Sequence, residues 1–280
     1  MNLLEAWDIY YKDKMIEGLS LKTLKDYKIQ INLLNNYFGN DYDINNINII
    51  DLKTYLAEKG SHLKMSSLGQ RIRVIRAFFK WVYEEEYINN NPAYKLKEPK
   101  LPKPLPKHLT DEEIEILLDA CKIPLESALI SFLFNTGCRA GEVYSLNRNS
   151  INWENRSCVV LGKGSKEREV YFSVRCAVYL KKYLNSRNDL DTALFVTERA
   201  PHRTSMDQMR HVLKRVAKRT DIKRSVYLHL MRHSFAFHLM ENDCPISGIQ
   251  NLMGHARIST TLIYVQLSGR KRRDLFNKHF

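Results

Sequence analysis

Apolar residues recur three and four positions apart through the first hundred residues, which is the spacing of one face of an α-helix. Ser20 can cap one such run and Gly39 follows it, and the Asn-Asn-Asn-Pro stretch at 89–92 stops the last. The pattern therefore predicts an all-helical unit, with helices over residues 3–18, 21–38, 49–60 and 66–88.

A segment rich in proline and lysine follows this helical unit. Four of the eight prolines lie between Pro99 and Pro106, where they alternate with lysines. Such a segment is extended and stiff, and it does not continue a helix. The pattern predicts a helical domain over residues 1–97, a linker over 98–107, and a second domain over 108–280 that ends in a tail at 265–280.

Beyond the linker, the pattern changes from helices alone to helices with a small sheet. Thr110 and Glu113 form a capping box before a helical run, and residues 125–137 are typical of a buried helix. At 157–173, β-branched residues flank a Gly-Lys-Gly-Ser turn, which indicates a hairpin. Another capping box opens a basic helix at 206–219. The prediction is a mainly α chain whose second domain contains a small antiparallel β-sheet.

The chain has an excess of positive charge, with 44 Lys and Arg against 31 Asp and Glu and a formal net charge of +13. This excess favours a polyanionic partner, most often nucleic acid, although a general solubility charge is the alternative. We expect double-stranded DNA as the partner, contacted by basic residues of the helix at 66–88 and of the hairpin. These residues are Arg71, Arg73, Arg76, Lys80, Lys166 and Arg168.

The cysteines and the apolar runs argue against several other classes of protein. The five cysteines are scattered and form no Cys-x-x-Cys pair, which argues against a disulfide framework and a metal site and fits a reducing cytoplasm. The sequence contains no apolar run of the length that spans a membrane, and its first residues do not resemble a signal peptide. We expect a cytoplasmic, nucleoid-associated protein without membrane contact.

Residues 228–240 place polar groups among apolar ones. His229 and Arg232 are three residues apart, so they share one face of a helix at the edge of a core. Attack on a phosphodiester adds negative charge to its non-bridging oxygens, and the planar guanidinium of arginine binds two such oxygens. A surface arginine beside a satisfied core histidine is the alternative. His229 and His233 have the spacing of a zinc helix, but Leu230 stands where that motif needs glutamate, so no metal is predicted.

Three further residues have side chains suited to the same chemistry. Arg139 follows a buried helix and needs an anionic partner, which is either Glu142 or a ligand. Lys163 lies between two glycines at the hairpin tip, where its ammonium can reach into a groove; a solvated hairpin is the alternative. Tyr264 lies nine residues after His255, but it is one of fifteen tyrosines, most of which must serve packing or the surface. None of these residues indicates a function alone.

The order of these residues resembles that of one family. T-G-x-R is followed by G-K-G in a hairpin, by H-x-x-R-H, by G-H, and by a tyrosine nine residues later. With the stretches GKGSKER, LMRHSFAFHL and LMGHARISTTLIY, this order resembles the tyrosine recombinase (phage integrase) family, in its Xer-like, simple integrase branch. The resemblance covers the region after the linker, and the first domain is similar to the family's SAM-like core-binding domain. It implies the two-domain fold of DNA breaking-rejoining enzymes.

The resemblance also implies a site-specific recombinase that works through a 3′-phosphotyrosyl intermediate and a Holliday junction, for integration, excision or dimer resolution. It makes Tyr264 the nucleophile, with Arg139 and Arg232 bound to the scissile phosphate. It implies that His255 donates to a non-bridging oxygen and that Lys163 protonates the leaving 5′-oxygen.

The family pattern implies two supporting roles. His229 would help as a base toward Tyr264, and Glu142 would support the first arginine from behind. No metal or cofactor is implied, and rejoining needs no ATP because the covalent intermediate retains the energy of the phosphoester. The family also implies a homotetramer on DNA, in which each C-terminal tail packs on a neighbouring protomer.

Some positions depart from the family pattern. Val-Tyr-Phe follows the hairpin where Xer proteins often have a proline, and Ile-Tyr-Val-Gln stands where they commonly read Ile-Tyr-Thr-His. These differences weaken an assignment to chromosome resolution. The alternatives are a non-catalytic DNA-binding protein on the same scaffold, a type IB topoisomerase-like enzyme, and a metal-dependent nuclease. The sequence does not predict the target DNA.

Overall fold

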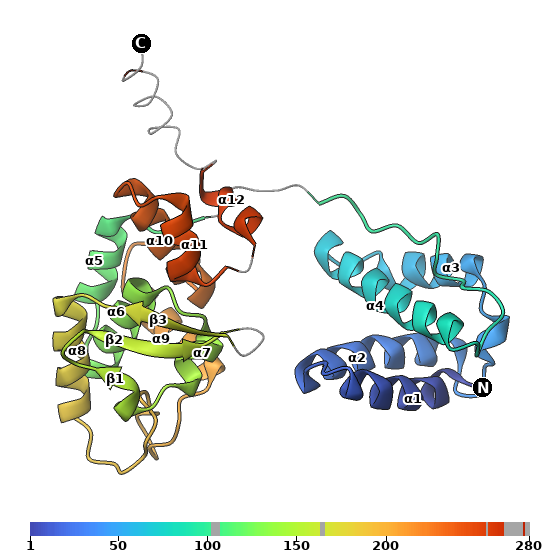
Figure 1. Cartoon of the computed structure of the whole chain (residues 1–280), viewed down its shortest axis with the longest axis horizontal. Coiled ribbons are helices and arrows are strands. Elements are labelled where there is room, and N and C mark those ends of the chain that lie inside the picture. Colours follow the sequence, from blue (N-terminus) through green and yellow to red (C-terminus); the bar gives the residue numbers. More distant parts are fainter. Residues whose placement is uncertain (102–106, 163–165, 256, 266–276, 278–280) are drawn as a thin grey trace. The chain divides into compact units, whose positions relative to one another are not determined.

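The chain forms two compact units, Met1–Lys103 and Pro104–Phe280, each with its own core (Figure 1). No helix in the described part of the chain is long and apolar enough to cross a membrane. The structure is a computed structural model that describes residues 1–101, 107–162, 166–255, 257–265 and 277.

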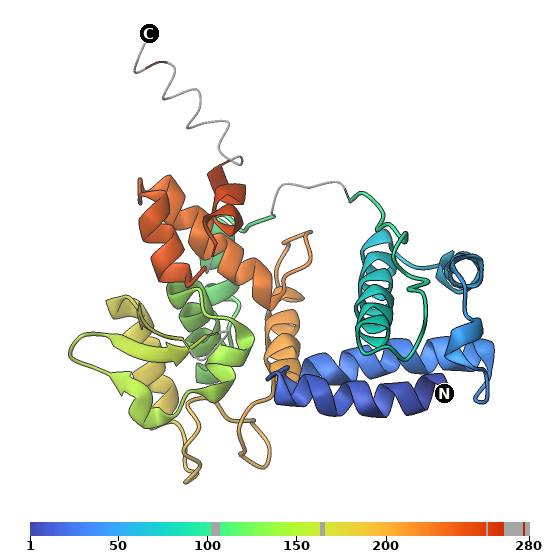
Figure 2. The same ribbon diagram turned by 45° about the vertical axis from the view of Figure 1, so that its right-hand side comes forward.

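The first unit is helical. α1 and α2 run antiparallel and side by side (Figures 1 and 2). Ser20 caps α2 by accepting a hydrogen bond from the N–H of Thr23, and Gly39 ends it with a φ of 101°, a conformation that favours glycine. The elements are α1 (Leu3–Ile16), α2 (Leu21–Phe38), the 3₁₀ turn η1 (Ile44–Asn46), α3 (Ile49–Gly60) and α4 (Met65–Glu84).

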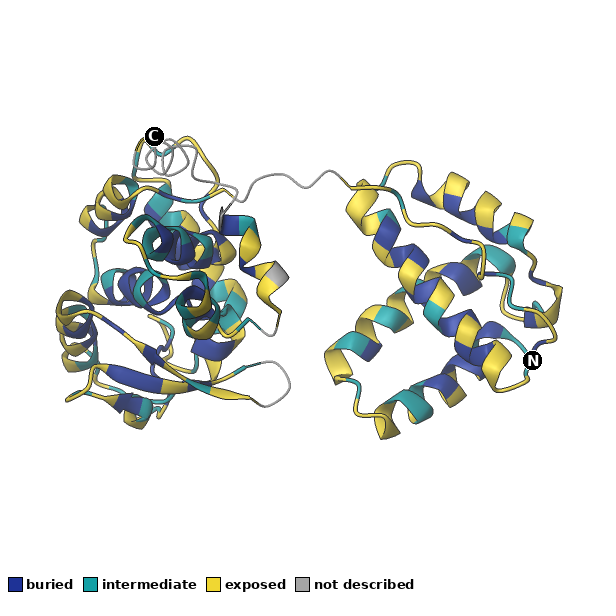
Figure 3. Ribbon diagram, turned by 45° about the horizontal axis from the view of Figure 1, so that its top comes forward, coloured by how far each residue is buried: buried dark blue, intermediate teal, exposed yellow. Residues whose placement is uncertain are grey.

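Aromatic rings form much of the core of the first unit. The ring of Tyr10 lies 5.5 Å from that of Trp7 and 5.1 Å from that of Trp81, so it joins α1 to α4. The indole N–H of Trp81 donates to the carboxylate of Asp13 at 2.8 Å. Buried and exposed residues alternate along α4 with helical spacing (Figure 3), so this helix presents one face to the core and the other to solvent.

The second unit combines helices with one small sheet. Its helices are α5 (Asp111–Asp119), α6 (Pro124–Thr136), α7 (Ala140–Ser145), α8 (Val174–Asn185), α9 (Met206–Ala217), α10 (Leu228–Glu241), α11 (Ile246–Met253) and α12 (Leu262–Val265). The 3₁₀ turns are η2 (Arg148–Ser150) and η3 (Ile258–Thr260), and the strands are β1 (Ile151–Asn152), β2 (Ser157–Leu161) and β3 (Glu167–Tyr171).

The sheet is antiparallel, in the order β1-β2-β3. Cys158, Val160 and Val170 point into the core that also contains α6, whereas Val159 and Leu161 are exposed. This alternation is the two-residue period of a strand with one face buried. The predicted mainly α fold with a small antiparallel sheet is confirmed.

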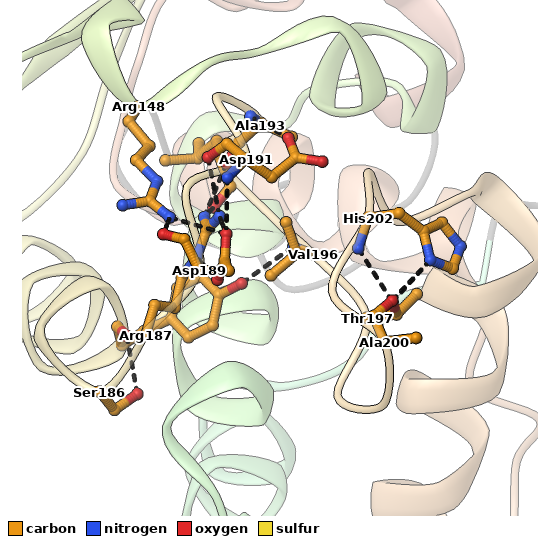
Figure 4. A network of polar contacts seen from close by, with 12 residues as sticks. Arg148, Ser186, Arg187, Asp189, Asp191, Ala193, Val196, Thr197, Ala200 and His202 are labelled. Carbon is orange, nitrogen blue, oxygen red and sulfur yellow. Dashed lines mark hydrogen bonds and ion pairs between the residues drawn. The ribbon is translucent and has the colours of Figure 1, made fainter.

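A buried arginine holds the segment between α8 and α9. Arg187, whose side chain is 4% exposed, donates to the carboxylate of Asp189 and to the carbonyls of Asp191 and Ala193 (Figure 4). Arg148 binds the same carboxylate at 2.8 Å. In Figure 1 this segment lies at the end of the unit opposite α11 and α12, so the network stabilises a loop that is remote from those helices.

Gly137 ends α6 in the left-handed region, with a φ of 58°, and a Cβ added there would overlap the ring of Phe235. We expect Gly137→Ala to lower the free energy of unfolding by at least about 2 kcal/mol, because the left-handed conformation and the overlap both disfavour a side chain. Gly141→Ala is the matched control, since its added Cβ would meet open space. Urea unfolding of both variants measures the difference; equal stabilities would contradict the expectation.

Candidate active site

Arg139 and Glu142 lie at the start of α7, directly after the left-handed turn at Gly137. The backbone N–H of Arg139 donates to Glu142 Oε2 at 2.7 Å, and its Nη1 donates to Oε1 at 2.9 Å. The side chain of Glu142 is 4% exposed, and that of Arg139 is 34% exposed. Arg139 therefore has Glu142 as an internal partner while its guanidinium stays open to a ligand.

A second arginine, Arg168 of β3, binds both oxygens of Glu142. Its Nη1 and Nη2 each lie 2.8 Å from a carboxylate oxygen, and its Nε donates to the carbonyl of Leu252 at 3.2 Å. Burial raises the pKa of Glu142, but the hydrogen bonds from Arg168 and Arg139 outweigh it and lower this pKa to about 2. Arg168 was predicted to contact DNA, and that prediction is untested; its guanidinium is directed inward and bound to Glu142, because its position on β3 faces the core.

Arg232, on α10, is buried among the ends of two other helices. Its guanidinium donates to the carbonyl of Gly137, which ends α6, and to that of Met253, which ends α11. Burial, and then the neighbouring charge of Arg139, lower the pKa of Arg232 to about 10, so the group is still a cation at neutral pH. Arg232 is fixed by backbone carbonyls and Arg139 by Glu142, and two neighbouring cations held in this way favour an anion between them.

Tyr264, on α12, points into this positive region and is 2% exposed. Its hydroxyl lies 2.8 Å from Nδ1 of His233, and its ring lies parallel to that of His255, at 6.5 Å between centroids. Burial raises the pKa of Tyr264 to about 12, although the charges of Arg232 and Arg139 lower it. The phenol is therefore protonated at neutral pH and needs a base to become a nucleophile.

His255 follows the left-handed turn at Gly254, which ends α11 with a φ of 61°. Its Nδ1 lies 2.9 Å from the hydroxyl oxygen of Thr261. Burial and the charges of Arg232 and Arg139 lower the pKa of His255 to about 4. The imidazole is therefore neutral at pH 7, with one N–H to donate.

The histidine that contacts the Tyr264 hydroxyl is His233, whereas the family resemblance assigned the role of base to His229. His229 lies one turn earlier on α10 and is exposed. Burial, followed by the charges of His229 and Arg232, lowers the pKa of His233, which keeps its imidazole neutral and able to accept a proton. In the described part of the chain, neither histidine belongs to a cluster of three or more residues that could hold a metal ion.

Lys163 and most of the C-terminal tail lie outside the described residues, so their roles stay predictions. The hairpin that carries Lys163 is closed by a hydrogen bond of 2.8 Å from the N–H of Gly162 to the carbonyl of Lys166. Lys166 is exposed beside this closure. Its predicted contact with DNA is therefore open to test.

Arg71 was predicted to contact DNA, but its side chain is directed into the first unit, so this contact stays an untested prediction. Its Nη1 donates to the carbonyl of Lys59 at 2.8 Å, its guanidinium lies over the ring of Tyr55, and the residue is 8% exposed. The guanidinium of Arg71 is therefore bound by groups within the first unit. Helical spacing could have indicated this, because Leu68 and Ile75 lie three residues before and four residues after it, on the same apolar face.

The other three basic residues of α4 lie on its exposed side. Arg73, Arg76 and Lys80 line a surface depression of about 760 Å³ together with Tyr83 and Tyr94. Cations interleaved with aromatic rings are suited to a nucleic acid, whose phosphates and bases they contact respectively. The prediction that these three residues contact DNA is compatible with their exposure.

The lowered pKa of His255 predicts that the second unit is destabilised by acid. This pKa of about 4 in the folded chain lies below the ordinary 6.5, so the unfolded chain binds the proton first as the pH falls. We expect the unit to be fully stabilised above pH 6.5 and to lose up to about 3 kcal/mol as the pH falls toward 4. Urea unfolding across this range measures the loss, and His255→Gln should reduce its slope. Identical slopes for the two proteins would contradict this origin.

Comparison with known proteins gives matches in both units. Residues 107–270 match the Phage integrase family, and residues 5–86 match the Phage integrase, N-terminal SAM-like domain. The chain is 31% identical over 276 residues to tyrosine recombinase XerD of Pasteurella multocida, across 93% of this chain and 92% of that protein. It is 30% identical over 279 residues to tyrosine recombinase XerC of Staphylococcus aureus, across 95% and 93%.

Solved structures share the fold. A lambda integrase dimer bound to a COC′ core site aligns with a TM-score of 0.76 and 18% identity, over 93% of this chain and 97% of that chain. XerH bound to a palindromic difH substrate, in a post-cleavage complex, aligns with a TM-score of 0.75 and 20% identity, over 94% and 81%. At these identities the likeness establishes the fold alone.

The fold and the matches define a tyrosine recombinase, an enzyme of the class that breaks and rejoins DNA at specific sites. The chain belongs to the phage integrase family, and Xer recombinases match nearly its whole length. The resemblance drawn from the order of the motifs is confirmed.

Proposed function

We propose that Tyr264 attacks a DNA phosphodiester and becomes bonded to the 3′-phosphate. Neutral His233 accepts the phenolic proton at Nδ1, the phenolic oxygen bonds to phosphorus, and the bond from phosphorus to the 5′-oxygen breaks. The 2.8 Å contact between the Tyr264 hydroxyl and His233 is the observation that carries this proposal. Without such a base, a tyrosine with a pKa of about 12 would rarely be ionised near neutrality.

The phosphate is bound by the cations around Tyr264. Arg139 and Arg232 meet the charge that develops on the non-bridging oxygens, and His255 donates its N–H to one of them. Lys163 supplies the proton that the 5′-oxygen needs as it leaves. His229 stays part of the proposed site, since it is exposed near the start of α10 and can contact bound DNA there.

The partner is double-stranded DNA that contains a specific recombination site. Arg73, Arg76 and Lys80 on α4 and Lys166 beside the hairpin contact its backbone, which the net charge of +13 supports. Exchange proceeds through a Holliday junction in a homotetramer, with the tail at 265–280 packed on the neighbouring protomer. The lambda integrase dimer bound to a core site and the XerH complex with its difH substrate support a DNA recombination site as the partner.

The proposed location is the cytoplasm, with the nucleoid. A DNA substrate favours this location, and the five cysteines, all free in the structure, suit a reducing compartment. No cofactor is needed by the proposed steps, since each proton and each charge is assigned to a side chain.

The proposed function is tested with nicked duplexes that contain a random segment. Wild-type protein is incubated with this library in EDTA without ATP, and duplexes attached to protein after denaturation in detergent are sequenced. A covalent adduct at a recurring site is expected. Binding without an adduct would support a DNA-binding protein, cleavage that EDTA abolishes would support a nuclease, and relaxation of plasmids that lack the site would support a topoisomerase. Each of these results would contradict the proposal.

A further inference from the structure

Arg168 lies on the buried side of β3. It pairs with Val160 of β2 and is followed two residues later by Val170, and both valines are in the core. Side chains two residues apart on a strand share a face, so the backbone directs this cation inward. Its side chain is only 12% exposed. A buried guanidinium requires partners that balance its charge and use its donors.

The partners of Arg168 belong to two other segments of the second unit. Its Nη1 and Nη2 bind the two oxygens of Glu142 on α7, and its Nε binds the carbonyl of Leu252 on α11. The guanidinium also lies against Gly254, where an added Cβ would be 2.8 Å from Cδ of Arg168. One side chain on β3 therefore connects α7, the end of α11 and the sheet.

Each connected segment carries a group of the proposed site. Glu142 binds the backbone and the guanidinium of Arg139, Gly254 directly precedes His255, and β3 is an arm of the hairpin that contains Lys163. A shift of Arg168 would be transmitted both to Arg139 and to His255.

Arg168 also determines how many hydrogen bonds form between Glu142 and the guanidinium of Arg139. Because Arg168 occupies both carboxylate oxygens, Arg139 gives Glu142 one guanidinium bond, from Nη1, in the described structure. If Arg168 were absent, the buried carboxylate would have Arg139 as its sole guanidinium partner and would attract it into a two-point contact. Arg139 would then turn its donors away from the phosphate.

We propose that Arg168 is a positioning residue that, through Glu142 and the Leu252–Gly254 turn, orients Arg139 and His255 for phosphate binding. The proposal rests on the proposed function, because it assigns a role within that same reaction. It differs from a DNA contact, which would act on affinity, and from a purely structural ion pair, which would act on folding alone.

The test uses full-length Arg168→Lys and Arg168→Gln with the nicked duplex selected by the wild-type protein. Two quantities are measured: the single-turnover rate of adduct formation at saturating DNA, and the Kd for the same duplex without a nick. Arg187→Gln is the matched control, since Arg187 is also a buried arginine with a carboxylate partner, but in the remote network of Figure 4. Thermal melts identify the temperature at which every variant is folded.

We expect Arg168→Gln to lower the adduct rate about 100-fold, since small misplacements of catalytic groups have effects of this size, with the Kd changed less than about threefold. Arg168→Lys, which keeps the charge but loses the two-point contact, should fold and lose about 10-fold. Arg187→Gln should keep the wild-type rate while folded. In a Glu142→Gln background, Arg168→Gln should add less than about a threefold further loss, because both changes remove one connection.

Three results would overturn the proposal. An unchanged rate in both Arg168 variants would exclude a positioning role, and a raised Kd with an unchanged rate at saturation would make Arg168 a DNA contact. An equal loss of rate in folded Arg187→Gln would reduce the effect to general structure. If wild type forms no adduct on any duplex, the proposed function fails together with the inference. If wild type does form the adduct, the rates of the Arg168 variants decide the inference.

Discussion

Tyr264→Phe is expected to abolish the covalent protein–DNA adduct, with a loss of at least about 10⁴-fold in the rate of its formation. The substitution removes the single oxygen that is proposed to bond to phosphorus, and it keeps the buried ring that packs beside His255. The affinity for DNA should be retained, because the residue is 2% exposed and contributes no charge. Denaturing gels of a nicked duplex measure the adduct, and a mobility shift measures the affinity.

Tyr183→Phe is the matched control for this change. Tyr183 is also buried, and its hydroxyl accepts a hydrogen bond from the N–H of Val196 at 2.9 Å, in the network remote from the site. It should form the adduct at the wild-type rate. A Tyr264→Phe protein that still attached to DNA would remove Tyr264 from the mechanism.

Arg232→Lys is expected to lower the adduct rate by about 10²–10³-fold, the range found when one preorganised donor is removed from a transition-state site. The guanidinium of Arg232 spans the carbonyls of Gly137 and Met253. A lysine has a single ammonium group in place of the planar guanidinium. That group cannot bind both carbonyls and the phosphate at the same time. Lysine therefore keeps the charge but loses its placement, and single-turnover kinetics at saturating DNA measure the effect.

The control for Arg232→Lys is Arg175→Lys. Arg175 is half-exposed and pairs with Glu115 on the surface, so the exchange should change neither the rate nor the fold. A rate for Arg232→Lys within about threefold of wild type would show that charge alone suffices and that the two carbonyl contacts do not orient the cation.

The helices of the first unit follow from local signals that the structure reproduces. Ser20 and Gly39 begin and end α2 as predicted, since capping groups satisfy backbone donors and carbonyls within one turn. α8 was not predicted, although Ser173 caps it by accepting from the N–H of Cys176. Its sequence follows the hairpin strand without a break in apolar character, so spacing alone did not separate it from the sheet.

Arg139, Arg232, His255 and Tyr264 could be named from the order of the motifs, but the contact of Tyr264 with His233 could not. His229 and His233 are four residues apart and share a helix face, so the sequence does not distinguish which one reaches Tyr264. That choice depends on how α12 packs against α10, which is a long-range contact. Only the structure places the hydroxyl beside His233.

The two arginines that were expected to contact DNA, and whose side chains lie inward, show a different limit. Positive charge was taken as a surface signal, although Arg71 lies on the apolar face of α4 and Arg168 shares the inward face of β3 with Val170. The helical period of 3.6 residues and the strand period of 2 would have placed both side chains inward, had they been applied to these residues. The partner that makes burial tolerable, such as Glu142 for Arg168, lies far along the chain and is visible only in the fold.

The most direct test of the central claim is to identify the residue that is bonded to DNA. Adduct from the wild-type protein is digested with nuclease and protease, and the peptide that retains a nucleotide is sequenced by mass spectrometry. The account predicts a 3′-phosphate joined to the phenolic oxygen of Tyr264. A nucleotide on any other residue, or adduct formation with an unmodified Tyr264, would contradict it.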